Sequence, residues 1–187
     1  MGHSQASKAE SRERILTEAA RRLREDGPDG LGIAALMQAA GLTHGGFYAH
    51  FPSRAALLEA ALARALEDGQ RASLAARAAQ GDAGLDGLAR SYLSRAHRDE
   101  PTTGCAIAAL AGEISRADPS AQQVMREAIE SIVARTEALI GAGPDSRERA
   151  LAAWSTLVGG LVLARATAGS PLSDEVLAAA RAGVAHL

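Results

Sequence analysis

Apolar residues recur along this chain at the three- and four-residue spacing that places them on one face of a helix. The pattern begins in a predicted helix over residues 8–26, whose apolar stripe consists of Ile15, Leu16, Ala19, Ala20 and Leu23. A glycine- and proline-rich cluster at 26–30 should end this helix. The pattern then predicts two short helices, over 32–39 and 43–49, and a long one from Ser53, a natural N-cap, to about Ala79.

The same periodicity predicts five more helices, and their boundaries fall at glycine and proline residues. They cover 84–98, 103–116, 120–140, 145–168, and a last stretch that starts near Ser173, with Ser173 and Asp174 as caps. Alanine and leucine dominate the apolar residues, whereas strand-forming residue types are sparse. We therefore expect an all-α fold of about nine helices.

The two short helices have the layout of a helix-turn-helix unit. Gly41 lies between them and can adopt the positive φ that such a turn needs. Thr43 can cap the second helix, which leaves His44, Gly45 and Gly46 at its exposed N-terminal end. In a recognition helix that end meets the base edges of DNA, and small residues there allow the backbone to approach closely.

The segment 41–51 reads Gly-Leu-Thr-His-Gly-Gly-Phe-Tyr-Ala-His-Phe and is followed by Ser53-Arg54 and Leu57-Leu58. This segment resembles the TetR family of transcriptional regulators, over about residues 10–58. The resemblance implies an N-terminal three-helix helix-turn-helix domain, residues 1–52. It also implies an effector-binding and dimerisation domain, residues 53–187, which matches the family in helix number and length only.

The resemblance also implies a set of DNA-binding residues, namely Thr43, His44, Gly45, Gly46, Tyr48, His50 and Arg54. Tyr48, His50 and Arg54 would contact operator phosphates, and the residues at the helix start would face the major groove. Phe47 and Phe51 are interpreted as core anchors of the recognition helix. Two alternatives stay open: Tyr48 as a core residue with a hydrated hydroxyl, and His44 as an exposed residue without a base contact.

Charge is nearly balanced, because 20 Lys and Arg oppose 22 Asp and Glu and give a net charge of −2. A DNA-binding surface must then be local. Residues 30–58 contain one arginine, Arg54, and no acidic residue, so the predicted reading surface is free of repulsion but not strongly basic. The segment 31–34 also lacks the family's small polar cap and basic residue. We therefore expect few phosphate contacts and a modest salt dependence of binding.

The last two predicted helices are the implied homodimer interface. The helix over 145–168 is apolar nearly all round, so it must be covered on more than one side. The predicted interface residues are Leu157, Leu161, Ala164, Val176, Ala180 and Val184. The alternative is ordinary packing of these residues within one chain.

The helices between residues 53 and 140 would enclose an effector pocket. Its candidate lining residues are Leu66, Tyr92, Cys105, Leu110, Met125, Ile129 and Trp154. Because alanine fills little volume, the alanine-rich body favours a cavity, and a small apolar molecule is the expected effector. Cys105 lies at a predicted helix start, where a thiol is more reactive, so a thiol-reactive effector is a second hypothesis against an inert Cys105.

Several protein classes are disfavoured. A single cysteine makes neither an internal disulfide nor a structural zinc site, and no apolar run reaches about 18 residues. Residues 1–24 are too charged for a signal peptide. Catalytic, phosphate-loop and metal-binding motifs are missing from the sequence, so we expect no enzyme, no cofactor and no metal.

The predicted protein is a cytoplasmic regulator that binds double-stranded operator DNA as a homodimer and has no membrane partner. We expect a repressor that a small-molecule effector releases from a palindromic operator. The alternative function is a helical ligand-binding or interaction module that binds no operator.

Overall fold

The computed structural model describes residues 2–80 and 84–187, and these residues form nine α-helices and two 3-10 helices, with no strand among them. The first elements are α1 (Gly2–Asp26), η1 (Pro28–Gly30), α2 (Ile33–Ala39), η2 (His44–Ala49), α3 (Arg54–Gln80) and α4 (Gly84–Tyr92). They are followed by α5 (Arg95–Asp99), α6 (Ala106–Ile114), α7 (Pro119–Ile140), α8 (Ser146–Ala166) and α9 (Pro171–Ala185). The predicted all-α class is confirmed.

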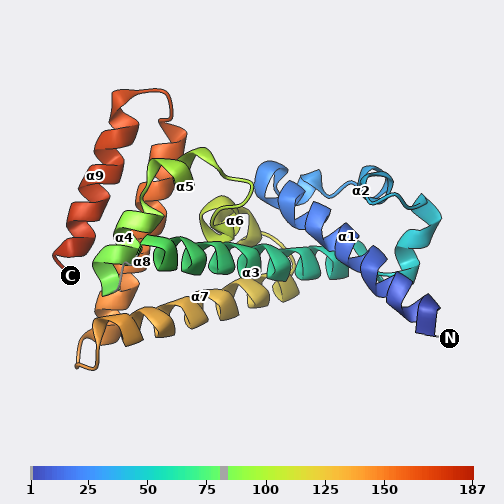
Figure 1. Cartoon of the computed structure of the whole chain (residues 1–187), viewed down its shortest axis with the longest axis horizontal. Coiled ribbons are helices and arrows are strands. Elements are labelled where there is room, and N and C mark those ends of the chain that lie inside the picture. Colours follow the sequence, from blue (N-terminus) through green and yellow to red (C-terminus); the bar gives the residue numbers. More distant parts are fainter. Residues whose placement is uncertain (1, 81–83) are drawn as a thin grey trace.

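The molecule is elongated, and its two termini lie at opposite ends (Figure 1). We call α1, η1, α2 and η2 the head, and α3 to α9 the body. The helices α3 and α7 run side by side along the long axis, and α8 and α9 form an antiparallel pair at the end far from the head (Figure 1). None of the described helices is both long and apolar enough to cross a membrane.

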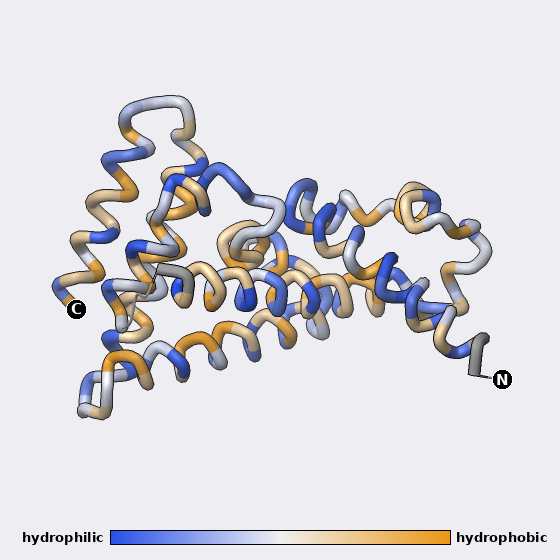
Figure 2. The backbone as a smooth tube through the Cα atoms, in the orientation of Figure 1, coloured by the Kyte–Doolittle hydropathy of each residue, from blue (hydrophilic) through white to orange (hydrophobic). Residues whose placement is uncertain are grey.

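Two apolar cores hold this arrangement together. The first joins the head to the N-terminal half of α3, to α6 and to the start of α7, and its largest buried side chains are Phe47 and Phe51. The second joins α4, α8 and α9. Figure 2 shows hydrophilic and hydrophobic positions alternating along the helices, as expected for helices with one buried face.

Several predicted boundaries need correction. The predicted helix over 84–98 is two helices, because the Ser94 Oγ accepts a hydrogen bond from the His97 N–H at 3.2 Å and so caps a new helix. The helix predicted from 103 begins at Ala106, with Cys105 in the N-cap position. The last helix begins at Pro171, a residue type favoured in the first helical turn. The predicted boundary between the helices over 53–79 and 84–98 includes residues 81–83, which lie outside the described residues.

The second helix of the motif also differs from expectation in kind. Residues 44–49 form a 3-10 helix, in which the Gly46 N–H bonds the Thr43 carbonyl at 3.0 Å and the His50 N–H bonds the Phe47 carbonyl at 2.9 Å. Two adjacent glycines weaken the α-helical preference of this short segment.

Gly160 permits the close approach of α8 to α9. A Cβ atom at this position would lie 2.6 Å from the Ala180 Cβ and 3.2 Å from the Leu93 Cδ2. Neighbouring Gly159 differs, since nothing lies within 4 Å of a Cβ added there. Only one of the two glycines is therefore required by packing within the chain.

Candidate DNA-binding surface and body cavity

The turn between α2 and η2 depends on Gly41, whose φ of 72° confirms the predicted positive value. An L-residue would be strained at this angle. The adjacent Leu42 N–H donates to the Met37 carbonyl at 2.8 Å, which closes the turn against the end of α2. Local sequence therefore fixes the angle at which the two short helices meet.

The N-terminal end of η2 faces solvent. Thr43, His44 and Gly45 are exposed, and Gly46 is half-buried near the Met37 side chain. Thr43 occupies the N-cap position, but its side chain makes no capping hydrogen bond, so the predicted capping role is wrong. Nothing lies within 4 Å of a Cβ added to Gly45, so no contact within the chain requires a glycine there.

The aromatic residues of the segment 47–51 divide between core and surface. Phe47 and Phe51 are buried, with ring centroids 5.8 Å apart, which confirms them as core anchors. The Tyr48 side chain is 72% exposed and touches Phe47 only edge-on, at 5.2 Å between centroids. This exposure argues against Tyr48 as a core residue, and it leaves the hydroxyl available at the surface.

His50 lies beside two cations of α1. Its pKa is lowered by burial and by the positive charges of Lys8 and Arg12, and its buried Nδ1 atom has no hydrogen-bond partner. The Arg12 guanidinium lies 5.1 Å from the centroid of the Phe51 ring, a cation–π geometry. Lys8 and Arg12 are four residues apart and so share a face of α1, a spacing that the sequence already contained.

Arg54 has a partner within the chain. Its guanidinium donates a hydrogen bond to the Pro28 carbonyl at 2.8 Å and so links the start of α3 to the turn after α1. The exposed guanidinium keeps further donors, so its phosphate contact stays a prediction. The preceding Ser53 is the expected cap of α3, because its Oγ accepts from the Ala56 N–H at 3.1 Å.

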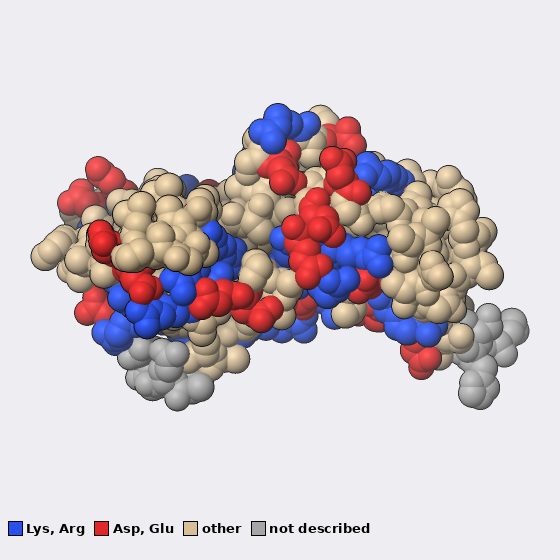
Figure 3. Space-filling view, turned by 90° about the horizontal axis from the view of Figure 1, so that it is seen from above, with Lys and Arg blue, Asp and Glu red and all other residues tan. Residues whose placement is uncertain are grey.

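The part of the head formed by α2 and η2 carries few charges. Figure 3 shows mainly uncharged residues there, next to bands of Lys, Arg, Asp and Glu over the middle of the molecule. This agrees with the sequence, in which no charged residue occurs from 30 to 53. Two features of this surface are therefore suited to DNA: the exposed N-terminal end of η2 and the α1 cations Lys8 and Arg12 near His50.

The family model described as bacterial regulatory proteins of the tetR family matches residues 15–61, from the middle of α1 into α3. Residues 15–61 therefore match the tetR family. The match supports an N-terminal helix-turn-helix of the kind found in DNA-binding regulators. Comparison with curated protein sequences gives no match.

Solved structures resemble the chain over nearly its whole length. A TetR-family transcriptional regulator from Cytophaga hutchinsonii has a TM-score of 0.81 at 20% identity and covers 97% of this chain and 96% of its own. A TetR regulator from Chloroflexus aurantiacus J-10-FL has a TM-score of 0.79 at 24% identity, with 96% of each chain covered. The reduced form of NemR from E. coli has a TM-score of 0.74 at 17% identity, covering 91% of this chain and 94% of its own. At sequence identities this low, the structural similarity establishes a shared fold alone.

The body of the molecule contains a cavity of about 630 Å³. Its walls come from α3, α4, α7, α8 and the segment 96–107, and Leu66, Tyr92, Cys105 and Trp154 of the predicted pocket set line it. This volume lies within the range of about 300–1,000 Å³ that is typical of small-molecule sites.

Three predicted pocket residues do not line this cavity. Leu110 and Met125 are buried in the core between head and body, and Ile129 is 38% exposed. The stripe of α7 that lines the cavity begins only at Ile132. Helical periodicity identified apolar residues correctly but did not show which of them face a packed core.

One wall of the cavity combines Tyr92, His97 and Cys105. His97 Nδ1 bonds the Tyr92 carbonyl at 2.7 Å, and its Nε2 accepts from the Cys105 N–H at 3.0 Å. These two bonds require a neutral ring with its proton on Nδ1, and burial lowers the His97 pKa accordingly. The Tyr92 ring packs edge-on against His97 at 4.7 Å and Trp154 at 5.3 Å.

Four of the predicted dimer-interface residues already pack inside one chain. Leu157, Leu161, Ala164 and Val184 are buried within the chain, in the second core. The remaining two, Val176 and Ala180, are half-buried and pack against that core. The apolar side chains that α8 and the start of α9 expose are Leu151, Val162, Leu163 and Leu172. An all-round apolar helix has more than one apolar stripe, and the sequence did not show which one packs inward.

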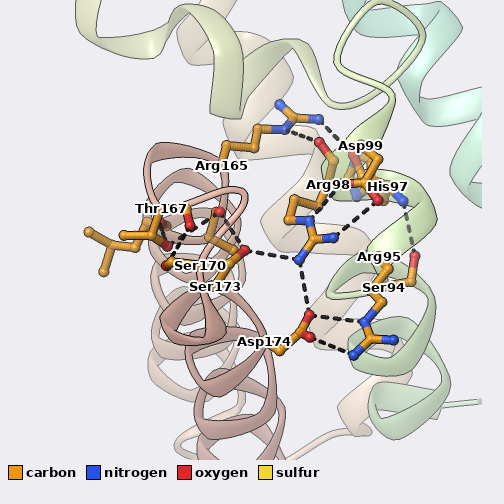
Figure 4. Close-up of polar contacts among 12 residues, drawn as sticks. Ser94, Arg95, His97, Arg98, Asp99, Arg165, Thr167, Ser170, Ser173 and Asp174 are labelled. Atoms are coloured by element: carbon orange, nitrogen blue, oxygen red, sulfur yellow. Dashed lines mark hydrogen bonds and ion pairs between the residues drawn. The ribbon is translucent and has the colours of Figure 1, made fainter.

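A polar network joins the cavity wall to α8 and α9 (Figure 4). Arg165 donates to the carbonyls of His97 at 2.8 Å and Arg98 at 3.2 Å. Arg98 in turn bonds the Ser173 Oγ at 2.9 Å and the Asp174 carboxylate at 3.0 Å. Ser173 was expected as a helix cap, but its hydroxyl donates to the Ala164 carbonyl at 2.7 Å instead.

A second polar link joins the head to the cavity wall. The Arg24 guanidinium of α1 donates to the Thr102 carbonyl and, at 3.2 Å, to the Ala65 carbonyl of α3. Burial lowers the Arg24 pKa. Thr102 immediately precedes the cavity-lining residues Thr103 and Gly104, so a head residue holds the loop that borders the cavity.

Proposed function

We propose that this chain is a dimeric repressor that a small molecule in the cavity releases from a palindromic operator. One observation carries the proposal: a single chain combines an exposed helix start on a buried aromatic anchor with a large cavity in its body. In this proposal residues 1–52 bind DNA, and residues 53–187 bind the effector and the second subunit.

The dimer is proposed to form through the exposed apolar side of α8 and α9. Leu151 and Val162 are 11 residues apart, about three helical turns, and therefore lie on one side of α8. A two-fold dimer would present two recognition helices to half-sites about 34–36 Å apart. The substitution Val162→Asp should then shift the chain to monomer in light scattering after size exclusion, and exposed Ala168→Asp should not.

Release requires two conformations that differ in their affinity for both ligands. An effector shifts the equilibrium only by its differential affinity for the two conformations. The Arg24–Thr102 link and the Arg165–Arg98–Asp174 network are the contacts through which filling of the cavity would alter the head and the dimer helices. A ligand that fills the cavity and leaves operator affinity unchanged would refute this mechanism.

The test of DNA binding is a gel shift with the DNA upstream of the chain's own gene. We expect sequence-specific binding by the wild type and loss of it in Tyr48→Ala, because the exposed ring and hydroxyl are proposed to contact the DNA backbone. Tyr48→Phe is the matched control, since it removes the hydroxyl alone. Equal binding of unrelated DNA would instead favour the alternative, a helical ligand-binding or interaction module that does not bind an operator.

A thiol-reactive effector is a second chemistry within this proposal, because half-buried Cys105 lines the cavity. Addition of its sulfur to an electrophilic alkene would form one carbon–sulfur bond and transfer the thiol proton to the neighbouring carbon. Cys105→Ser removes this reaction. Release of DNA by N-ethylmaleimide that persists in C105S would exclude Cys105 as the sensor.

A further inference from the structure

We propose that the cavity binds an amphipathic organic anion, a molecule with an apolar body and one acidic group, and not a purely apolar compound. The inference deepens the proposed function, and its regulatory meaning rests on it. It draws on three features of the cavity: its apolar walls, two arginines without carboxylate partners, and a buried hydroxyl without a partner.

The walls of the cavity are largely apolar. Side chains from five helices contribute, among them Leu66, Leu88, Ile107, Ile132, Leu139 and Trp154. Burying the apolar body of a ligand against such walls is favourable by about 25 cal/mol per Å² of area removed from water. The walls therefore account for the body of a ligand but not for the polar groups that also line the cavity.

Arg77 and Arg135 are the two cations of the cavity wall, and within the described part of the chain neither has a carboxylate partner. Within the described residues the Arg77 Nε is buried without a partner, and one terminal nitrogen donates to the Gly84 carbonyl at 3.5 Å. Arg135 donates to the Ser131 Oγ at 2.7 Å, and burial alone lowers its pKa. A partly desolvated guanidinium is costly unless an anion compensates it.

Glu100 also lines the cavity and is the acidic residue that could compensate the arginines. Its carboxylate instead accepts a hydrogen bond from the Thr102 hydroxyl, in the segment after α5. No acidic group contributes to the pKa shift of Arg135, whose one cause is burial. The arginine donors therefore remain available to a ligand.

The Tyr92 hydroxyl is the third feature. The residue is 4% exposed, lines the cavity, and its hydroxyl has no hydrogen-bond partner. Burial, and next the charge and side-chain hydrogen bonding of the neighbouring Cys105, raise its pKa, so the hydroxyl stays protonated. A cysteine sulfur is only a weak acceptor, and no nitrogen or oxygen of the described residues accepts from this hydroxyl, so it remains able to donate to a stronger acceptor. Buried polar groups are nearly always paired, so an unpaired donor facing a cavity indicates a ligand that brings an acceptor.

Two dyes of nearly the same shape test the charge requirement. 1-Anilinonaphthalene-8-sulfonate carries a sulfonate, and N-phenyl-1-naphthylamine has the same arylamine body without it. Trp154, the one tryptophan of the chain, lines the cavity, so energy transfer from it reports binding at this site. We expect the wild type to bind the anionic dye more tightly than the neutral dye, without DNA present.

The double variant Arg77→Gln/Arg135→Gln should weaken binding of the anionic dye about tenfold or more, because charge-assisted hydrogen bonds are lost. Binding of the neutral dye should change by less than about twofold, which shows that the cavity is intact. The matched control is Arg126→Gln, also on α7, whose guanidinium bonds Gln123 on the exposed surface. It should bind both dyes as the wild type does.

Three results would overturn the proposal: equal affinity of the wild type for both dyes, anionic-dye binding unchanged in the double variant, or an equal loss in Arg126→Gln. A competition assay extends the test, since 4-phenylbutanoate should displace the dye and its uncharged amide should not. Regulation is measured separately, by the effect of 4-phenylbutanoate on operator binding. If the acid binds in the cavity but leaves operator binding unchanged, the anion site stands and the proposed repressor function fails.

Discussion

The two halves of α3 lie in opposite surroundings. Its N-terminal half buries Leu57, Ala61 and Leu62 in a filled core with the head, whereas its C-terminal half, from Leu66 to Arg77, borders a cavity of about 630 Å³. A filled core fixes the position of the recognition element, since close-packed interiors do not deform gradually. The hollow half keeps polar groups unpaired and depends on a ligand to complete it. One helix thus joins a rigid reading surface to an incomplete binding site.

The strongest test of the filled half is Phe47→Ala, which removes the buried side chain that anchors η2 in the core. Truncation of a buried phenylalanine costs about 3–5 kcal/mol of unfolding free energy, and DNA binding should be lost with it. Urea unfolding measures the first effect and a gel shift the second. Tyr48→Ala is the control, because an exposed side chain should change stability by less than about 0.5 kcal/mol. If both variants lose equal stability, the division into anchor and surface residue is wrong.

The body has a filled part of its own, where α8 meets α9, and Gly160→Ala tests it. The new Cβ would lie 2.6 Å from the Ala180 Cβ, so the helices must separate, and we expect a loss of about 1–3 kcal/mol in thermal unfolding. Gly159→Ala is the matched control. With no neighbour within 4 Å it should gain about 0.5–1 kcal/mol from helix propensity. Similar losses in both variants would show that the two glycines do not differ as described.

The head was predictable from its sequence because its signals act over one or two turns. The positive φ of Gly41, the Ser53 cap and the buried pair Phe47 and Phe51 all follow from residues next to them in sequence. The 3-10 form of η2 did not follow, since the balance between two helix types in six residues depends on what packs beneath them.

The body was less predictable because its site is assembled over long sequence distances. Arg77 and Arg135 are separated by 58 residues and meet one cavity through two different helices. In the same way Leu157 and Leu161 could face inward or outward, and only the arrangement of α4 and α9 decides. Periodicity shows that a stripe exists, whereas tertiary packing selects the partner of each stripe.

For the hollow half, removal of the Tyr92 hydroxyl should stabilise the empty protein. Tyr92→Phe keeps the ring contacts with Trp154 and His97 and deletes a buried donor that has no partner. We expect a gain of about 1 kcal/mol in unfolding free energy without ligand. Thermal unfolding with and without bound anion measures the balance, and the ligand should stabilise the variant less than the wild type. A less stable empty variant would mean that the hydroxyl already has a partner.

A smaller effect should appear in the pH dependence of the unfolding free energy, and His97 in the cavity wall is its expected source. Burial, and to a lesser extent the positive charge of Arg165, lower the pKa of folded His97 below the ordinary 6.5, against the opposing effect of its bond to the Tyr92 carbonyl. The neutral ring accepts from the Cys105 N–H. As pH falls through 6.5, His97 takes up a proton in the unfolded chain but not yet in the folded chain, so the folded state loses stability. His50, whose pKa is also lowered, acts in the same direction, and the difference between wild type and His97→Gln isolates His97.

Urea unfolding from about pH 7.5 to about pH 5.5 measures this difference. The wild type should lose more stability over the interval than His97→Gln, which is less stable at the higher pH but titrates less. His186→Gln, at the exposed end of α9, is the control and should keep the wild-type slope. Equal slopes in wild type and His97→Gln would show that folded His97 takes up a proton as readily as the unfolded chain, so that its bond from the Cys105 N–H is given up at little cost in stability. The polar contacts of the cavity wall would then rearrange at little cost in stability, and the contrast with the close-packed core beneath η2 would be greater still.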